Sequence, residues 1–190
     1  GYLSKAEKLS LEHLPVRDVT YWNALISGYA QHDQAEEALR CFQQMQHEGL
    51  SPNTITFVSL LNACGIIGAI EKGKEIHDQI LRQPLLLKDI LIGTALVDMY
   101  VKCGELCKAQ QVLYELPYRD TVSWNTIIAG YVRHEHYDEA LNCYARLEFE
   151  GISANSVTLM CILKACSAIG IIEKGQEVHG EIERKGFHVK

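Results

Sequence analysis

Proline and flexible linker sequence are scarce in this chain. It has only four prolines among 190 residues, and no run of serine and glycine interrupts it. Its longest apolar run is far shorter than the roughly 20 residues that cross a bilayer, and no charged segment followed by an apolar one opens it. We therefore expect regular elements throughout and no membrane span. Because Gly1 stands in mid-pattern with no initiating methionine, we also expect the sequence to be a piece of a longer protein.

Positive charge is in the minority. The chain has 18 lysines and arginines against 24 aspartates and glutamates, which gives a net charge of −6. An acidic protein does not coat nucleic acid through its overall field, so any site for a polyanion must be arranged locally. The composition, 47% hydrophobic and 22% charged, is that of a globular protein.

The seven cysteines do not follow the spacing of a disulfide framework, and their number is odd. These features indicate a reducing compartment and no disulfides. Cys41 and Cys64 recur as Cys143 and Cys166 at one fixed distance, so we expect these four to be small core residues.

The fixed distance belongs to a long internal repeat. The stretch YWNALISGYAQHDQAEEALRCFQQMQHEGLSPN, from Tyr21, returns as SWNTIIAGYVRHEHYDEALNCYARLEFEGISAN, from Ser123. Trp22, for example, recurs as Trp124, 102 positions later. Self-similarity at a fixed period indicates stacked supersecondary units, each of which buries its apolar face against its neighbours.

Each unit is predicted to be a pair of helices. Apolar residues at Trp22, Leu25, Ile26 and Tyr29 have the i, i+3, i+4, i+7 spacing of one helix face, and the next segment repeats the spacing before HEGLSPN supplies stop signals. We therefore predict an all-α, right-handed superhelical solenoid of helix-turn-helix repeats, with the first helix of each repeat on the concave side. We also expect the ends of the array to leave apolar side chains exposed, at Leu9, Val178 and Ile182.

The motifs W-N-x-x-I-x-G-Y, E-A-L and G-x-x-x-N occur in units of 35, 36 and 31 residues. This pattern resembles pentatricopeptide repeats of the plant PLS subclass. ACGIIGAIEKGKEIH resembles part of an L repeat, and LVDMYVKCGELCKAQQVLYELPYRD resembles part of an S repeat. The resemblance covers essentially the whole chain. The repeats it implies are a partial S repeat 1–18, P repeat 19–53, L repeat 54–89, S repeat 90–120, P repeat 121–155 and L repeat 156–190.

The resemblance implies sequence-specific binding of single-stranded RNA, one base per repeat, in a mitochondrion or chloroplast. It also implies a role as the targeting segment of a C-to-U editing factor, with MORF-type cofactor proteins docking on the L repeats. The alternative is a protein-binding helical scaffold that resembles tetratricopeptide arrays, which the acidic charge would permit.

In this family the fifth and last residues of a repeat together select the base. The corresponding pairs are Asn23 with Asn53, Val58 with Asp89, Thr94 with Asp120, Asn125 with Asn155, and Met160 with Lys190. The resemblance implies that Asn/Asn reads cytosine, and uracil less strongly, and that Thr/Asp reads guanine. Val58 and Met160 have no group that reads a base edge, so the L repeats are expected to be permissive.

Other residues of the first helices are expected to contact the rest of the RNA. The second residue of each repeat would flank the bases: Thr20, Ile55, Leu91, Val122 and Val157. Lys102 and Arg133, two turns after the base-reading positions, are expected to meet phosphate.

The sequence offers little for catalysis. His179-Gly180-Glu181 matches half of a zinc deaminase signature, but no C-x-x-C follows. The pairs Cys103/Cys107 and His134/His136 lack further ligands in sequence, and GIIGAIEKGK does not have the order of a phosphate-binding loop. We expect no enzyme activity, no metal and no cofactor.

Overall fold

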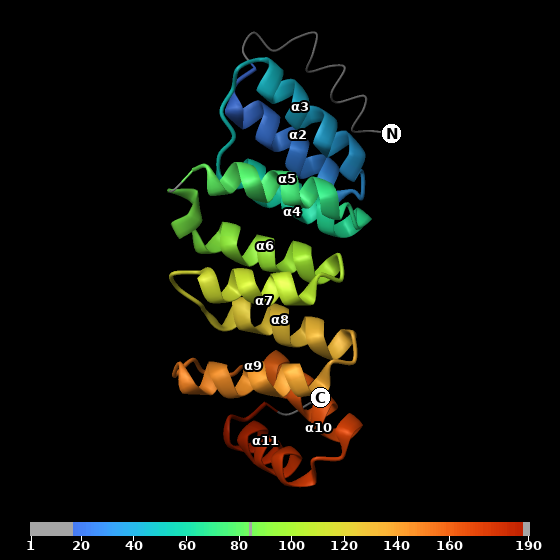
Figure 1. The fold of residues 1–190 in the computed structure, drawn as a ribbon, viewed down its shortest axis with the longest axis vertical. Coiled ribbons are helices and arrows are strands. Elements are labelled where there is room, and N and C mark those ends of the chain that lie inside the picture. The colour runs from blue at the N-terminus through green and yellow to red at the C-terminus, as the bar shows by residue number, and fades with distance from the viewer. Residues whose placement is uncertain (1–16, 84, 188–190) are drawn as a thin grey trace. The chain divides into compact units, whose positions relative to one another are not determined.

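A computed structural model of the chain describes residues 17–83 and 85–187 (Figure 1). Within these residues the chain forms ten α-helices and one short 3-10 helix, and no strand. The predicted all-α class is therefore confirmed for the described residues. The partial S repeat lies almost entirely outside them, as do Leu9 and Lys190.

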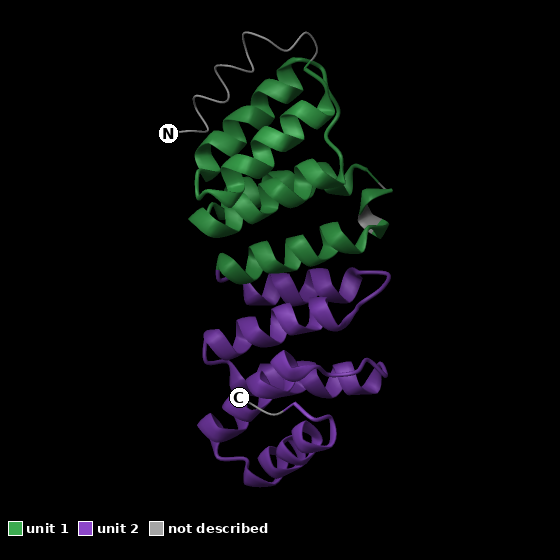
Figure 2. Ribbon diagram, turned by 180° about the vertical axis from the view of Figure 1, so that it is seen from behind, with its two compact units in different colours: residues 1–103 green, residues 104–190 purple. Residues whose placement is uncertain are grey.

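The chain divides into two compact units, residues 1–103 and 104–190 (Figure 2). The helices described in unit 1 are α2 (Val19–Gln31), α3 (Ala35–His47), α4 (Thr54–Ile67), α5 (Ile70–Leu81), the 3-10 helix η1 (Leu86–Lys88) and α6 (Ile90–Lys102). Those in unit 2 are α7 (Leu106–Glu115), α8 (Thr121–Arg133), α9 (Tyr137–Phe149), α10 (Ser156–Ile169) and α11 (Ile172–Arg184).

Within each unit the helices pack as hairpins. In unit 1, α2 pairs with α3 and α4 pairs with α5, while the first helices α2, α4 and α6 pack on one another in order. In unit 2, α8 pairs with α9 and α10 pairs with α11, and α10 also packs on α8. The apolar stripes meet between the helices: Phe42 and Phe57 pack edge to face at 6.3 Å in unit 1, and Trp124 is completely buried in unit 2.

An N-cap begins each first helix. The five caps are Asp18 on α2, Asn53 on α4, Asp89 on α6, Asp120 on α8 and Asn155 on α10. Each is in extended conformation, and its side-chain oxygen accepts a hydrogen bond from a backbone N–H of the first turn. Such a cap contributes about 1 kcal/mol. In every predicted repeat except the final one, the last residue is thus also the residue that starts the next helix.

The turn inside the hairpins differs between the repeats predicted as L and those predicted as P. In the L repeats a left-handed residue ends the first helix, and it is glycine both times, Gly68 and Gly170. In the P repeats the left-handed residues are Asp33 and Glu135, with φ of 57° and 64°. A side chain in this conformation costs energy that glycine avoids, so the P-repeat turns are the more strained.

The expectation that Val178 and Ile182 are exposed is wrong. Their exposed fractions are only 1% and 9%. Both lie on α11, which packs against α10, so the partner helix of their own hairpin covers the stripe. The exposed apolar residue of this helix is instead Ile172, at its first position, with an exposed fraction of 73%.

A carboxylate ties the end of each P-repeat hairpin to its beginning. Glu150 accepts hydrogen bonds from the indole N–H of Trp124, at 3.3 Å, and from Arg119 Nε, at 2.9 Å. Glu48 makes the same contacts with Trp22 and Arg17, both at 3.1 Å. The arginine directly precedes the N-cap residue in both copies, so this bridge holds the cap next to the hairpin.

These contacts lower the pKa of Glu150 below its usual value. Burial alone would raise the pKa, but the hydrogen bond and charge of Arg119, together with the Trp124 N–H, favour the ionised form more strongly.

The left-handed turn gives a prediction about stability. Gly170 has φ of 76°, and a methyl group added there would meet no atom within 4 Å, so only the backbone conformation opposes a side chain. Gly170→Ala should lower the free energy of unfolding by about 1 kcal/mol. Gly175→Ala, inside α11, is the matched control, because its methyl group would make an ordinary 3.7 Å contact with Cys166 and alanine favours the helix. Urea denaturation should give shifts of opposite sign; equal shifts would contradict the turn argument.

The Glu150 bridge predicts a pH dependence. A depressed carboxyl pKa stabilises the folded state above the unfolded pKa of about 4.3, and this contribution is lost as pH falls through the folded pKa. Glu150→Gln should therefore lower the free energy of unfolding by about 1 kcal/mol at pH 7, with the difference from wild type shrinking below about pH 4. Denaturation followed by tryptophan fluorescence measures this. The control is Glu173→Gln, on the exposed surface of α11; a pH-independent Glu150 effect would exclude ionisation as the cause.

Candidate nucleic-acid interface

In the first P repeat, the predicted base-reading pair is joined by hydrogen bonds. Asn23, on α2, donates its amide N–H to Asn53 Oδ1 at 3.1 Å. Thr56, in the first turn of α4, donates its hydroxyl to Asn23 Oδ1 and accepts from the backbone N–H of Asn53. Asn23 is 7% exposed and Thr56 is completely buried, whereas Asn53 is exposed. The fifth and last residues of this repeat therefore act as one group.

The N-cap decides which atoms of this group remain available. Asn53 Oδ1 accepts from the backbone N–H of Thr56, and only the oxygen of an amide can do so. The same oxygen accepts from Asn23, so both of its lone pairs are occupied. The Nδ2 hydrogens of Asn53 and the second amide hydrogen of Asn23 remain. The pair thus offers hydrogen-bond donors.

The second P repeat has the same arrangement in unit 2. Asn125 Nδ2 donates to Asn155 Oδ1 at 3.0 Å, and the hydroxyl of Thr158 donates to Asn125 Oδ1. Asn155 Oδ1 also accepts from the backbone N–H of Thr158 at 3.1 Å. Two copies with the same donor pattern show that the arrangement belongs to the repeat.

The S repeat ends on a carboxylate instead. Asp120 is exposed and uses Oδ1 to cap α8, through the backbone N–H of Ser123 at 2.8 Å. Its other oxygen is an acceptor, so this cap offers the opposite chemistry to that of the asparagines. Thr94, its predicted partner, is half-buried on α6 in unit 1, whereas Asp120 lies in unit 2. Their pairing stays a prediction.

The first L repeat ends on a carboxylate whose two oxygens are both engaged. Asp89 accepts from the backbone N–H of Leu91 with one oxygen and from the hydroxyl of Thr54 with the other, at 2.9 and 2.8 Å. The fifth residues of the two L repeats are Val58, which is half-buried, and Met160, whose exposed fraction is 49%. Lys190 lies outside the described residues. The L-repeat positions therefore display little that could read a base edge.

Apolar side chains stand exposed next to these positions. The four apolar residues at the second position of a repeat expose more than half of their surface: Ile55 57%, Leu91 63%, Val122 58% and Val157 52%. Thr20, the fifth member, is exposed as well. Water-facing β-branched and leucine side chains on the first turn of four successive first helices are not explained by the core, and they suit contact with a flat apolar ligand.

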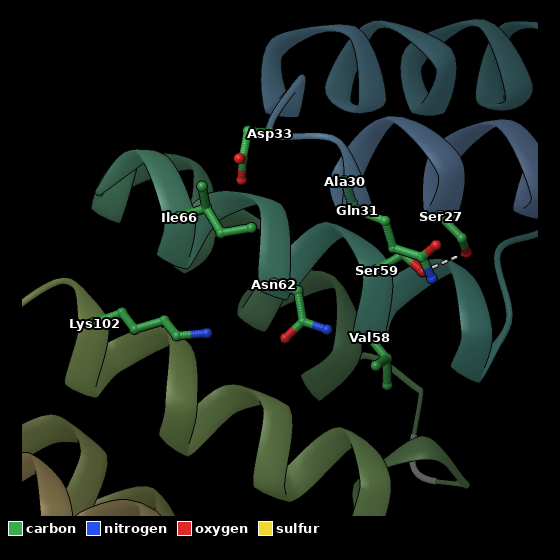
Figure 3. Close-up of a pocket in the computed structure, with 9 residues that line it drawn as sticks. All are labelled: Ser27, Ala30, Gln31, Asp33, Val58, Ser59, Asn62, Ile66 and Lys102. Atoms are coloured by element: carbon green, nitrogen blue, oxygen red, sulfur yellow. Dashed lines mark hydrogen bonds between the residues drawn. The ribbon is translucent and has the colours of Figure 1, made fainter. Parts of the chain in front are cut away.

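A groove of about 440 Å³ in unit 1 runs over α2, α4 and α6 (Figure 3). Polar side chains line it, among them Gln31, Ser59 and Asn62, and Asn62 and Lys102 reach toward the same space. Lys102 already pairs with Asp98 at 2.6 Å. In unit 2, Arg133 is exposed and has no ion pair with any carboxylate of that unit's described residues. The two predicted phosphate contacts therefore differ in available charge.

Sequence reasoning missed Thr56 and Thr158, as well as the pairing of Asp98 with Lys102. A signal existed for each. A hydroxyl residue three positions after an asparagine is the spacing of a capping box, which the structure forms at both sites across the predicted repeat boundary. Asp98 stands four residues before Lys102, the spacing of neighbouring side chains on a helix.

The histidines and cysteines occupy structural or surface places. His77 is buried and its Nδ1 lies 2.9 Å from the hydroxyl of Tyr100, whereas His179 is exposed. Burial raises the pKa of the Cys64 and Cys143 thiols to about 12, which makes both unreactive near neutral pH. No disulfide joins the seven cysteines, all of which lie in the described part of the chain.

The described residues hold neither a metal-binding cluster nor a membrane-spanning helix. They contain no group of three or more histidine, cysteine or acidic side chains placed to hold a metal ion. None of their helices combines the length and apolarity required to cross a bilayer.

The fold is similar to that of solved repeat proteins. The crystal structure of the pentatricopeptide repeat protein PPR10 in complex with an 18-nt psaJ RNA element aligns with a TM-score of 0.76 and 20% identity, over 92% of this chain and 26% of that one. PPR10 from maize gives a TM-score of 0.74 and 20% identity, over 95% of this chain and 26% of that one. This similarity confirms the predicted fold class, an all-α solenoid of helix-turn-helix repeats.

Sequence relatives agree. Pentatricopeptide repeat-containing protein At4g30700 of Arabidopsis thaliana is 37% identical over 186 residues, 97% of this chain and 23% of the relative. Pentatricopeptide repeat-containing protein At3g02330, mitochondrial, of the same plant is 38% identical over 156 residues, 82% of this chain and 17% of the relative. The chain thus spans less than a quarter of either relative. A model of the PPR repeat family matches residues 17–65 and 119–168. The chain therefore belongs to the PPR repeat family.

Proposed function

We propose that this chain binds single-stranded RNA sequence-specifically, one base per repeat. The observation that carries the proposal is the pair of linked asparagines in each P repeat, Asn23 with Asn53 and Asn125 with Asn155. In both pairs the second asparagine is the N-cap of the following helix, two residues before an exposed apolar side chain. PPR10, which shares the fold, has been solved with an RNA element bound.

The donor pattern favours particular bases. Cytosine has two adjacent acceptors, N3 and O2, which suit the two donors that an asparagine pair offers. Uracil places a donor between its acceptors, so it satisfies fewer of them. The acceptor of Asp120 suits the N1–H and N2–H donors of guanine. The exposed Ile55, Leu91, Val122 and Val157 would pack on the base planes, and the L repeats would accept any base.

We further propose that the parent protein is a PLS-subclass C-to-U editing factor of a plant mitochondrion or chloroplast. The alternating repeat lengths and the different turns of the P and L repeats support the subclass. A relative whose name places it in mitochondria supports an organelle. In this proposal the chain supplies targeting and not catalysis.

The L repeats are proposed to dock MORF-type cofactor proteins. In both, isoleucines surround the turn between the two helices and remain exposed: Ile66 45%, Ile67 45%, Ile171 40% and Ile172 73%. The corresponding turns of the P repeats are polar. This feature also favours the alternative function, a protein-binding scaffold, because apolar surface at a turn suits a protein partner.

A panel of RNAs that differ at single bases tests the proposed function. Read 5′ to 3′ along the chain from its N-terminus, the five repeats predict pyrimidine-any-G-pyrimidine-any. Filter binding should rank RNAs with this core, in constant flanks, above those with a changed first, third or fourth base. Equal affinity for all of them would reject base reading and favour the scaffold.

Changing one cap should change one base. Asp120→Asn keeps the N-cap, because the amide oxygen can still accept from Ser123, but it replaces the outward acceptor by a donor. The preference at the third base should move from guanine toward adenine, whose N1 is an acceptor. One edge contact corresponds to a change of about ten- to a hundredfold in relative affinity. The control is the fourth base, read by Asn125 and Asn155, where the preference should stay the same. A guanine preference that survives the change would remove Asp120 as a reader.

The two cations predicted to meet phosphate should contribute unequally. Arg133→Ala should weaken binding to all RNAs alike, because phosphate contacts carry no base information. The slope of log affinity against log salt concentration should fall by about one, because one phosphate contact is lost. Lys102→Ala should do less, since Asp98 already neutralises this lysine. Asp98→Asn, the matched variant, should strengthen binding by freeing the lysine. Titrations at several salt concentrations measure this; a loss confined to one RNA sequence would contradict a phosphate role.

A further inference from the structure

We infer that Thr56 and Thr158, which lie outside the pairs that select the base, are positioning residues that determine which atoms each asparagine pair shows to RNA. The inference rests on the proposed reading of RNA by those pairs. It concerns the third residue of the repeat that follows each P repeat, a position on the buried side of α4 and α10.

The hydrogen bonds around Thr56 form a closed ring with one direction. Its hydroxyl accepts from the backbone N–H of Asn53, so its own single proton must go to another acceptor. Two acceptors lie within reach, Asn53 Oδ1 at 3.1 Å and Asn23 Oδ1, and the proton goes to Asn23 because that contact is the shorter. The oxygen of Asn23 is thereby turned inward, and its Nδ2 faces Asn53 Oδ1 at 3.1 Å. The only groups of the two asparagines that then face outward from the ring are hydrogen-bond donors.

Burial gives the ring its rigidity. Thr56 and Thr158 are both completely buried, and Asn23 is 7% exposed. An amide oxygen held there without a donor would cost about 1–3 kcal/mol, so it would turn toward water if the hydroxyl were removed. The asparagine would then show RNA both an acceptor and a donor, and it would no longer discriminate between base edges.

The other repeats differ at this position in the way their caps require. After the S repeat the third residue is Ser123, whose hydroxyl donates to the backbone oxygen of Asp120. After the first L repeat it is Ile92, which has no hydroxyl, and there both oxygens of Asp89 are engaged. Among the described repeats, only the Asn/Asn pairs are followed by a threonine at this position, and its hydroxyl donates to the fifth residue of the preceding repeat.

The duplicated site allows a test with an internal control. Thr56→Val removes the hydroxyl at nearly constant shape and should reduce the preference for cytosine over purines at the first base by about tenfold, while the preference at the fourth base stays the same. Thr158→Val should do the reverse. Thr56→Ser restores the hydroxyl and should restore the preference. Competition between RNAs that differ only at the first or fourth base measures each ratio.

A merely structural role predicts a different result. In that case Thr56→Val would lower the melting temperature or weaken binding to every RNA equally, with no change in the ratio between bases. Wild-type protein that binds no RNA, or binds without preference at either position, rejects the proposed function itself. Wild-type preference that both valine variants retain overturns this inference alone.

A measurement on unmodified protein covers the case in which the valine variants fail to fold. The side-chain amide hydrogens of Asn23 and Asn125 that are bonded in the ring should exchange with water at least tenfold more slowly than those of Asn142, which is exposed on α9. NMR of 15N-labelled protein reads each amide separately. Exchange as fast as that of Asn142 at both sites would overturn the inference.

Discussion

The hydrogen bond between an N-cap side chain and the first turn of the following helix connects the parts of this protein that concern function. It ends one repeat and begins the next, at Asn53, Asp89, Asp120 and Asn155 alike. This bond occupies one oxygen of the capping side chain, because a backbone N–H can donate only to an acceptor atom. What remains on the surface is therefore fixed by residue type: a donor from asparagine and an acceptor from aspartate. In the proposed reading of RNA, one side chain therefore serves both stability and recognition.

The rest of each hairpin holds this side chain in place. Trp124 and Arg119 stand on either side of the Asp120 cap and meet at Glu150, which comes from the far end of the hairpin. Packing of the apolar stripes brings the helices together, but the bridge links the start of one helix to the end of the next. A cap held this way loses little freedom when a ligand binds, which is how a preformed site gains affinity.

Much of the fold could be predicted from the sequence, because a 3.6-residue stripe repeated at fixed distance leaves few alternatives to stacked hairpins. The burial of Val178 and Ile182 could not, since a single apolar stripe does not say which neighbour covers it. In the site, residue types such as Asn23 and Asn53 stand out by repetition. The direction of their amides does not, because it depends on Thr56, a buried hydroxyl whose contact crosses a predicted repeat boundary. The i, i+4 pairing of Lys102 with Asp98 was available from spacing alone.

In the proposed reading of RNA, repeats that select a base differ from those that do not by the number of polar atoms that the cap leaves unbonded. In the L repeat, Thr54 takes the second oxygen of Asp89, and Val58 offers no polar group, so nothing remains for a base edge. In the P repeats, the ring of hydrogen bonds around the threonine occupies the amide oxygens of both asparagines, so only their amide hydrogens remain. Under the proposed function, the same N-cap geometry therefore leaves no polar atom for a base in one repeat and a selective set of donors in another. Alternation along the chain requires no change in helix arrangement, only a change in which neighbours the capping side chain has.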